Sequence, residues 1–362
     1  MKKTTAFVLP LVLSLLLGCF PTGGISSAAE TDAAEYQPGL NATLNISYPD
    51  NPPKKVQIYS GSFMEWNIRD LGEFFIPGFE SLSDEDIEEY TERENSRGAF
   101  FSYKLKDGQR ISTSPGMIIY TRNENDPRDF GINYTYYCGA GESEEEMRKV
   151  YPFTEFSDFS SQEALKYAQN AVNELGLENL TAPQIYSVKS RISPFLNDSP
   201  EMAALYSEEQ LNALTGNPAY YILYTVQLDG YKTPVAETYF GSSDMAGIYG
   251  FAEFLIDKDG LQHFFAAGLM DYVPTGEYVN ICAPNEAVEK MRNSFGMTNE
   301  IVPGEIYGAE LFYLGDYDNY SKTSEFIPVW RFVKERDLGG KFPKCDFYYY
   351  DARTLAMYGK AG

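Results

Sequence analysis

Short runs in which apolar and polar residues alternate dominate the chain after residue 40, and this alternation predicts β-strands. In the first half, the stretches that predict strands are 41–49, 54–68, 99–122 and 131–138. The third of these contains Asp107-Gly108, a pair typical of a tight hairpin turn. We therefore expect a β-rich N-terminal domain over residues 39–155.

One acidic stretch inside this domain, SLSDEDIEEYTERENS at 81–96, predicts a helix instead. Ser83 is a suitable N-cap, and Asp86 stands three positions later, as in a capping box. Acidic side chains are also favourable near the positive end of a helix dipole. The expected domain therefore carries one exposed acidic helix.

The second half contains a helix-then-strands pattern that occurs twice. In residues 160–176, Ser160 and Glu163 form a capping box, and Gly176 is a stop signal. The apolar positions on one face of this helix are Leu165, Ala168, Val172 and Leu175. The strands expected after it are 183–190, 218–235 and 250–274, the last turning at Asp259-Gly260, with a helical insertion at 199–216.

The second copy is a shorter helix over residues 284–296, in which Pro284 stands in the first turn and Gly296 is the stop. Its apolar face consists of Val288, Met291 and Phe295. The strands expected after it are 308–318, 326–335 and 345–359. The fold class predicted is α+β, with antiparallel sheets each packed by a helix, in units at 156–282 and 283–362.

The beginning of the chain has the pattern of a secretory signal. Lys2 and Lys3 precede an apolar run at 7–17, which is too short to span a bilayer of about 30 Å. Leu-Leu-Gly-Cys resembles the lipobox of bacterial lipoproteins, and this predicts a signal peptide at 1–18 with lipidation of Cys19. The alternative is a plain signal peptide with an incidental cysteine.

Residues 19–38 are rich in small and acidic residues and predict a flexible tether, with a reach of about 24 Å. We therefore expect the protein at the cell membrane, lipid-anchored on the extracytoplasmic face. The formal net charge of −23 argues against nucleic acid as a partner.

Aromatic residues make up 15% of the chain, and a sheet-rich fold accounts for most of them. Tyrosine-lined faces that bind sugars or peptides are the alternative. In a strand Tyr348 and Tyr350 share one side and Tyr349 takes the other, so Trp330, Tyr348 and Tyr350 are a candidate binding face. One face of the strand must also pack against the helix of its unit, and this favours a core position for most of these side chains.

No residue pattern in the sequence predicts catalysis, a metal or a cofactor. The single histidine, His263, falls inside a predicted strand, and we expect a strand-face residue rather than a catalyst. The acids at 257–260 suit a hairpin turn better than a calcium loop, and 315–326 lacks the ligand glutamate of such a loop. Cys282 and Cys345 are either bridged or reduced.

A Pro-Val-Trp strand at 328–330 and a last strand that ends in Asp-Ala at 351–352 resemble the PepSY-type unit. Two such units, the first with YTVQLDGYKTPV at 224–235, are similar to the YycI/YycH family, extracytoplasmic regulators of a sensor histidine kinase in Firmicutes. The resemblance covers about residues 160–360. Those regulators have a transmembrane helix where this chain has Cys19, which points more closely to uncharacterised Firmicutes lipoproteins.

The function predicted is a non-catalytic cell-surface lipoprotein that binds an envelope protein or peptide. The alternatives are a carbohydrate- or solute-binding lipoprotein and a hydrolase. A free strand edge favours the first. A pocket above about 300 Å³ lined by Tyr and Trp favours the second, and acids clustered in a cleft favour the third.

Overall fold

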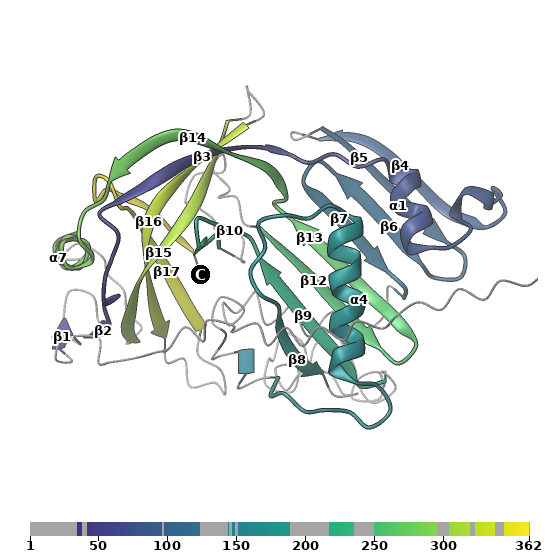
Figure 1. Cartoon of the computed structure of the whole chain (residues 1–362), viewed down its shortest axis with the longest axis horizontal. Helices are drawn as coiled ribbons and strands as arrows, with labels where there is room; N and C mark the ends of the chain where they lie inside the picture. The colour runs from purple at the N-terminus through teal and green to yellow at the C-terminus, as the bar shows by residue number, and fades with distance from the viewer. Residues whose placement is uncertain are drawn as a thin grey trace, which may run out of the picture.

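The computed structural model describes residues 35–37, 42–95, 98–123, 144, 147–148, 151–188, 217–234, 250–294, 304–318, 323–336 and 344–361. Over these residues the protein is α+β, as predicted, with mostly antiparallel sheets and few helices. Figure 1 shows two large sheets beside each other, with α1 and α4 on one of them and α7 beside the other. The helix bounds are α1 (Ile68–Phe75), α4 (Ser161–Glu174) and α7 (Pro284–Ser294), with a 3₁₀ turn η1 (Phe79–Ser81).

Sheet 1 has eight described strands, and all its neighbouring pairs are antiparallel. The predicted hairpins at Asp107-Gly108 and Asp259-Gly260 are both confirmed in it. Across the sheet the strands are β4 (Ile87–Asn95), β5 (Gly98–Leu105), β6 (Arg110–Ser114), β7 (Met117–Thr121), β13 (Gly260–Ala267), β12 (Phe251–Asp257), β9 (Ala219–Thr225) and β8 (Gln184–Val188).

Sheet 2 also has eight described strands and is antiparallel except where β2 meets β15. The main path is β1 (Glu35–Gln37), β2 (Ala42–Asn45), β15 (Gly304–Asp318), β16 (Thr323–Arg336), β17 (Lys344–Asp351) and β18 (Met357–Ala361). Two further strands, β3 (Lys55–Phe63) and β14 (Met270–Asn280), pair with each other, and β3 joins the start of β16. A small hairpin of β10 (Gln227–Leu228) and β11 (Tyr231–Lys232) stands apart.

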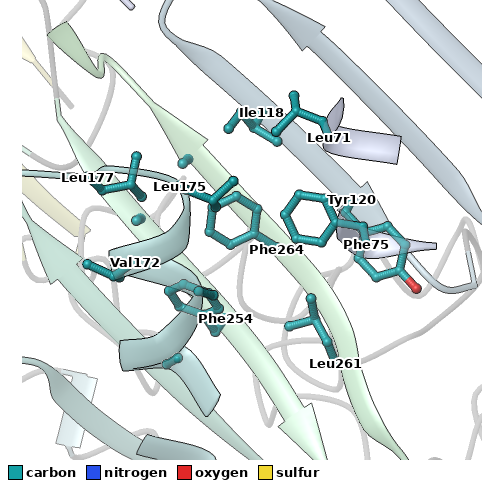
Figure 2. Close-up of a cluster of buried hydrophobic side chains, with 14 of the residues drawn as sticks. Leu71, Phe75, Ile118, Tyr120, Val172, Leu175, Leu177, Phe254, Leu261 and Phe264 are labelled. Carbon is teal, nitrogen blue, oxygen red and sulfur yellow. The ribbon is translucent and has the colours of Figure 1, made fainter. Parts of the chain in front are cut away.

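Helix α4 forms where its capping signals predict. The hydroxyl of Ser160 accepts from the backbone N–H of Glu163, whose carboxylate accepts from the backbone N–H of Ser160. Gly176 follows the helix with φ of +67°, a conformation that favours glycine. In Figure 2, Val172 and Leu175 lie beside Phe254 and Phe264 of the strands beneath. The apolar stripe of the sequence therefore becomes the helix–sheet core.

Helix α7 packs on sheet 2 in the same way. Ala287, Val288 and Met291 are buried against a core that includes Trp330 and Tyr348. Each helix is thus followed by four strands that lie side by side in the order of the chain, although the separate hairpin of β10 and β11 comes between β9 and β12. These strands are β8, β9, β12 and β13 after α4, and β15 to β18 after α7.

The acidic helix predicted at 81–96 is wrong. The hydroxyl and the backbone N–H of Ser83 both donate to the carboxylate of Asp86, at 2.7 and 2.9 Å, but they close a turn rather than begin a helix. Strand β4 follows, and its Tyr90 packs against the cross-strand Tyr103 in a tilted arrangement with ring centroids 4.6 Å apart. Pairing with β5 outweighs the weak helical preference of this stretch.

Helix α1 was not expected from the sequence, because its eight residues are few for a periodic signal. The side chain of Asn67 caps it by accepting from the backbone N–H of Arg69. Phe75 stacks on Tyr120 and Phe264 with centroids 5.1 and 5.2 Å apart. Helix α1 therefore covers the same face of sheet 1 as α4, as Figure 1 shows.

Strand pairing does not follow the predicted boundaries of 39–155, 156–282 and 283–362. The strands before residue 123 divide between the two sheets: β1 to β3 belong to sheet 2, and β4 to β7 extend sheet 1 beyond β13. The end of the predicted tether, 35–37, is the strand β1. The reason is that long-range strand pairing leaves no signal within a local window of sequence.

Several predictions fall outside the described residues. These are the signal peptide, Cys19, most of the tether, the strand at 131–138, the helix at 199–216, and the helix end at Phe295 and Gly296. Cys282 is a free thiol, so the alternative of a bridge to Cys345 is wrong. Within the described ranges, no helix has the length and apolarity needed to cross a membrane.

Buried tyrosines make the protein sensitive to alkali. Burial raises the pKa of Tyr120 and Tyr224 to about 12, and it raises the pKa of Tyr272 and Tyr350 further. Between pH 10 and 12 the native state therefore holds more protons than the unfolded chain. The stabilisation is complete below pH 10 and decreases as the pH rises.

In an alkaline titration we expect the absorbance of tyrosinate from the buried tyrosines to appear only above pH 10. It should appear together with the loss of far-ultraviolet circular dichroism. The control is the chain unfolded in guanidinium, whose tyrosines titrate near the ordinary value of 10. A native chain that ionises all its tyrosines near pH 10 without losing structure would contradict this prediction.

Candidate functional site

A groove of about 540 Å³ lies on the face of sheet 1 opposite to α1 and α4. Its described lining comes from alternate positions of five strands, β4, β5, β6, β7 and β13. The residues between these positions, such as Ile111, Ile118 and Phe264, point into the core under the helices. The groove is therefore a direct result of the two-residue period of the strands.

One row of cross-strand neighbours forms a hydroxyl-rich line in the groove. The strand register places Thr91 beside Ser102, Ser102 beside Ser112, and Ser112 beside Ile119 and then Phe265. Ser112 donates a hydrogen bond of 2.8 Å to Ser102, and both side chains are buried. The row changes from polar at β4 to apolar at β13.

A second row carries charge and runs parallel to the first. Arg110 is the cross-strand partner of Thr121, which in turn faces His263. A guanidinium nitrogen of Arg110 lies 3.7 Å from a carboxylate oxygen of Glu89. Glu89 is well exposed, so this ion pair contributes little stability.

Arg93 lies at the β4 end of the groove. Its guanidinium carbon stands 4.7 Å from the ring centroid of Phe100, which is a cation–π arrangement. Phe100 is also its cross-strand partner, so the stack is set by the β4–β5 register. The described lining thus has two arginines against one glutamate.

The only histidine of the sequence stands on the floor of this groove. The Nδ1 atom of His263 is 3.3 Å from the hydroxyl of Thr121, and its Nε2 atom is 3.7 Å from the carboxylate of Glu253. The hydroxyl of Tyr221 donates to the other oxygen of Glu253 at 2.6 Å. Glu253 is 1% exposed, so this carboxylate depends on these partners for its stability.

We expect Glu253→Ala to lower the free energy of unfolding by about 3 kcal/mol, because it leaves buried polar partners without their carboxylate. Glu253→Gln is the matched control, since its amide oxygen can still accept from Tyr221, and we expect it to cost less. Urea unfolding followed by circular dichroism measures both. Equal stabilities of the two variants would contradict this role of the carboxylate.

The candidate binding face Trp330, Tyr348 and Tyr350 is wrong as an exposed surface. All three side chains are 0% exposed and lie in the core beneath α7. Trp330 donates its indole N–H to the carbonyl of Cys282 at 3.1 Å. The structure therefore shows the alternative expectation, in which these side chains lie in the core under the helix.

His263 is a strand residue, as predicted, but strand alternation alone did not reveal the groove around it. The groove residues Thr121, Ser112 and Ser102 come from three further strands, and β4, which completes the groove, was predicted to be helical. The available signal was a set of polar residues at alternating positions in otherwise apolar strands. Their register across the sheet is not readable from one sequence.

The aspartates at 257 and 259, which were considered as calcium ligands, have protein partners. The carboxylate of Asp257 accepts from the backbone N–H of Asp259 and from the side-chain amide of Gln262. Of the stretch 315–326, residues 319–322 lie outside the description. Within the described residues, no three His, Cys, Asp or Glu side chains gather as a metal site.

Comparison with known proteins gives a fold relative and no function. No family model matches the chain, and no curated protein matches it. The chain is similar to the crystal structure of an uncharacterized protein from Eubacterium rectale ATCC 33656, with a TM-score of 0.58 and 13% sequence identity. The likeness covers 88% of this chain and 90% of that one, and it concerns the fold alone.

Proposed function

We propose that this protein is a lipid-anchored, extracytoplasmic binding module whose groove on sheet 1 holds a peptide segment of another envelope protein. The observation that carries this proposal is the position of the groove, which opens beside the edge strand β4. Among the described strands, β4 pairs only with β5. Hydroxyls, guanidinium groups and two phenylalanine rings offer hydrogen bonds and apolar contact along the same face.

An extended peptide suits this geometry because it can add to the edge of a sheet. Its alternate side chains would then project over Thr91 and Arg93, which lie on the groove face of β4. Main-chain hydrogen bonds supply affinity in such complexes, and the side-chain contacts supply specificity. The protein therefore acts by recognition in this proposal.

The repeated helix-and-meander order supports the further proposal that residues 160–360 contain two PepSY-type units like those of YycI/YycH regulators. Each helix, α4 and α7, packs on a sheet in which four later strands lie side by side in chain order, and in the first set the β10–β11 hairpin is inserted between β9 and β12. The partner proposed is accordingly an envelope regulatory or sensor protein.

A solute or carbohydrate ligand is the second candidate. The groove volume of about 540 Å³ lies in the range of small-molecule sites. Its described lining includes Phe100 and Phe265 but neither Tyr nor Trp, the side chains expected for a sugar platform. The peptide proposal fits this lining better.

Site-specific photo-crosslinking in intact cells tests the peptide proposal. A photoreactive residue at Thr91, on the groove face, should crosslink to a segment of an envelope protein. The same residue at Asn170, on the exposed side of α4, is the control and should not capture that segment. Capture of a glycan from Thr91 would favour the second candidate, and equal capture from both positions would reject the groove.

Lipid anchoring has its own test. We expect the wild-type protein in the membrane fraction and Cys19→Ser in the medium, because the variant has no thiol to acylate. Cys282→Ser is the matched control and should remain in membranes, since Cys282 is a free thiol of the folded domain. Retention of Cys19→Ser in the membrane fraction would overturn the anchor.

A further inference from the structure

Arg93 is held in place at the groove by its stack on Phe100. Strand register fixes the partner ring, and the cation–π contact keeps the guanidinium over the groove face. The contact with the ring face uses the charge of the guanidinium and leaves its N–H donors available for hydrogen bonds. The donors of Arg93 are therefore positioned without being used by the stack.

No acceptor among the described residues uses these donors. In the described part of the chain, the Arg93 side chain makes neither a hydrogen bond nor an ion pair beyond the ring contact. Its neighbours Glu92 and Glu94 point to the other face of β4 by strand alternation. The carboxylate of Glu92 instead accepts from the hydroxyl of Tyr90 at 2.6 Å.

Arg93 has no ion pair among the described residues, although the chain has 52 acidic and 29 basic residues. Other arginines with a described ion pair have close carboxylates: Arg148 with Glu144 at 2.7 Å, and Arg331 with Glu310 at 2.6 Å. Arg93 combines a fixed position, unused donors and a place in a groove. These three properties together favour an anionic ligand group.

A hydroxyl donor lies close to this arginine. Ser102 already accepts the hydrogen bond from Ser112, so its own O–H remains to donate. Ser102 is the cross-strand partner of Thr91, which lies two residues from Arg93 on the same face of β4. A guanidinium with a neighbouring hydroxyl matches the two oxygens of a carboxylate.

We propose that Arg93 binds a carboxylate of the peptide held in the groove, so that the groove selects acidic peptides. This inference rests on the proposed peptide-binding function. The carboxylate comes from an Asp or Glu side chain or from the C-terminus of the peptide. The net charge of −23 disfavours highly charged anions, and the local excess of arginine in the groove lining provides a site for one carboxylate.

Three pools of random octapeptides, built from the same neutral residues, test this inference on the purified full chain. The first pool has a free C-terminus and no acidic side chain. The second is amidated and has one Glu in the middle, and the third is amidated with Gln at that position. Retention of each pool on immobilised protein is measured by mass spectrometry for wild type, Arg93→Gln, Arg93→Lys and Arg69→Gln.

We expect the protein to retain about ten or more times as much of the first or the second pool as of the third. The reason is that hydrogen bonds to a charged carboxylate are stronger than those to a neutral amide. The pool that is retained identifies the source of the carboxylate. Arg93→Gln should remove the difference, and Arg93→Lys should restore part of it, because it keeps the charge without the planar fork. Arg69→Gln, an exposed change of equal charge on α1, should retain the full difference.

Two results would overturn the inference, and they differ in whether the proposed peptide-binding function survives. If wild type retains the third pool as well as the others, or if Arg93→Gln leaves the preference intact, then the groove binds peptides without Arg93 as its anion contact. If no pool is retained at all, then the proposed peptide-binding function fails, and the inference fails with it.

Discussion

Replacement of Trp330 by alanine should lower the free energy of unfolding by about 3–5 kcal/mol, the usual range for a fully buried aromatic side chain. Trp330 is 0% exposed and fills the core between β16 and α7. Its indole N–H also satisfies the carbonyl of Cys282, which would lose this partner. A loss of this size is a large fraction of the stability of an ordinary domain.

Urea unfolding followed by circular dichroism measures this effect, with the midpoint compared at an unchanged slope. Tyr278→Ala is a control, because Tyr278 is 61% exposed and should change stability by less than about 0.5 kcal/mol. A loss below about 1 kcal/mol for Trp330→Ala would contradict the core position. Such a result would return Trp330 to consideration as a surface contact.

Replacement of Gly116 by alanine should cost about 2–4 kcal/mol, for two separate reasons. Its φ of +73° is unfavourable for residues with a side chain, and the added Cβ would stand 2.3 Å from the ring of Phe63. The Cβ would also approach the carbonyl oxygen of Leu269 to 3.1 Å. Phe63 is the last residue of β3, and Leu269 lies between β13 and β14, so both neighbours stand where the chain passes between the two sheets.

Gly116 is critical because the two sheets meet at its backbone. Its N–H donates to the carbonyl of Met64, and its carbonyl accepts from the N–H of Leu269. Met64 follows β3, and Leu269 joins β13 to β14, so both segments run from one sheet to the other, as Figure 1 shows. A shift of this turn would disturb both crossings.

Gly108→Ala separates the two causes. Gly108 has φ of +94°, but nothing lies within 4 Å of the position of its Cβ. This variant should therefore show the backbone cost alone, about 1 kcal/mol. Urea unfolding of both variants gives the difference, and equal losses would show that the clash with Phe63 is relieved without cost.

Local signals in the sequence were sufficient for the elements that depend on neighbouring residues. Ser160 and Glu163 specify the start of α4, and Asp107-Gly108 specifies a hairpin. The same logic failed for Ser83 and Asp86, whose hydrogen bonds form but close a turn before a strand. A local contact restricts the chain near it, but it does not decide what the following residues pair with.

The α+β class, helix α4 with its caps, and the hairpins at Asp107-Gly108 and Asp259-Gly260 could be predicted from the sequence alone. Only the tertiary structure decided that β4 to β7 extend sheet 1 and that Arg93, Ser102, Thr121 and His263 line one groove. The physical reason is that helix caps, turns and alternation are governed by interactions over a few residues. Strand register joins residues such as Thr121 and His263, which are 142 positions apart, and depends on the packing of the whole sheet.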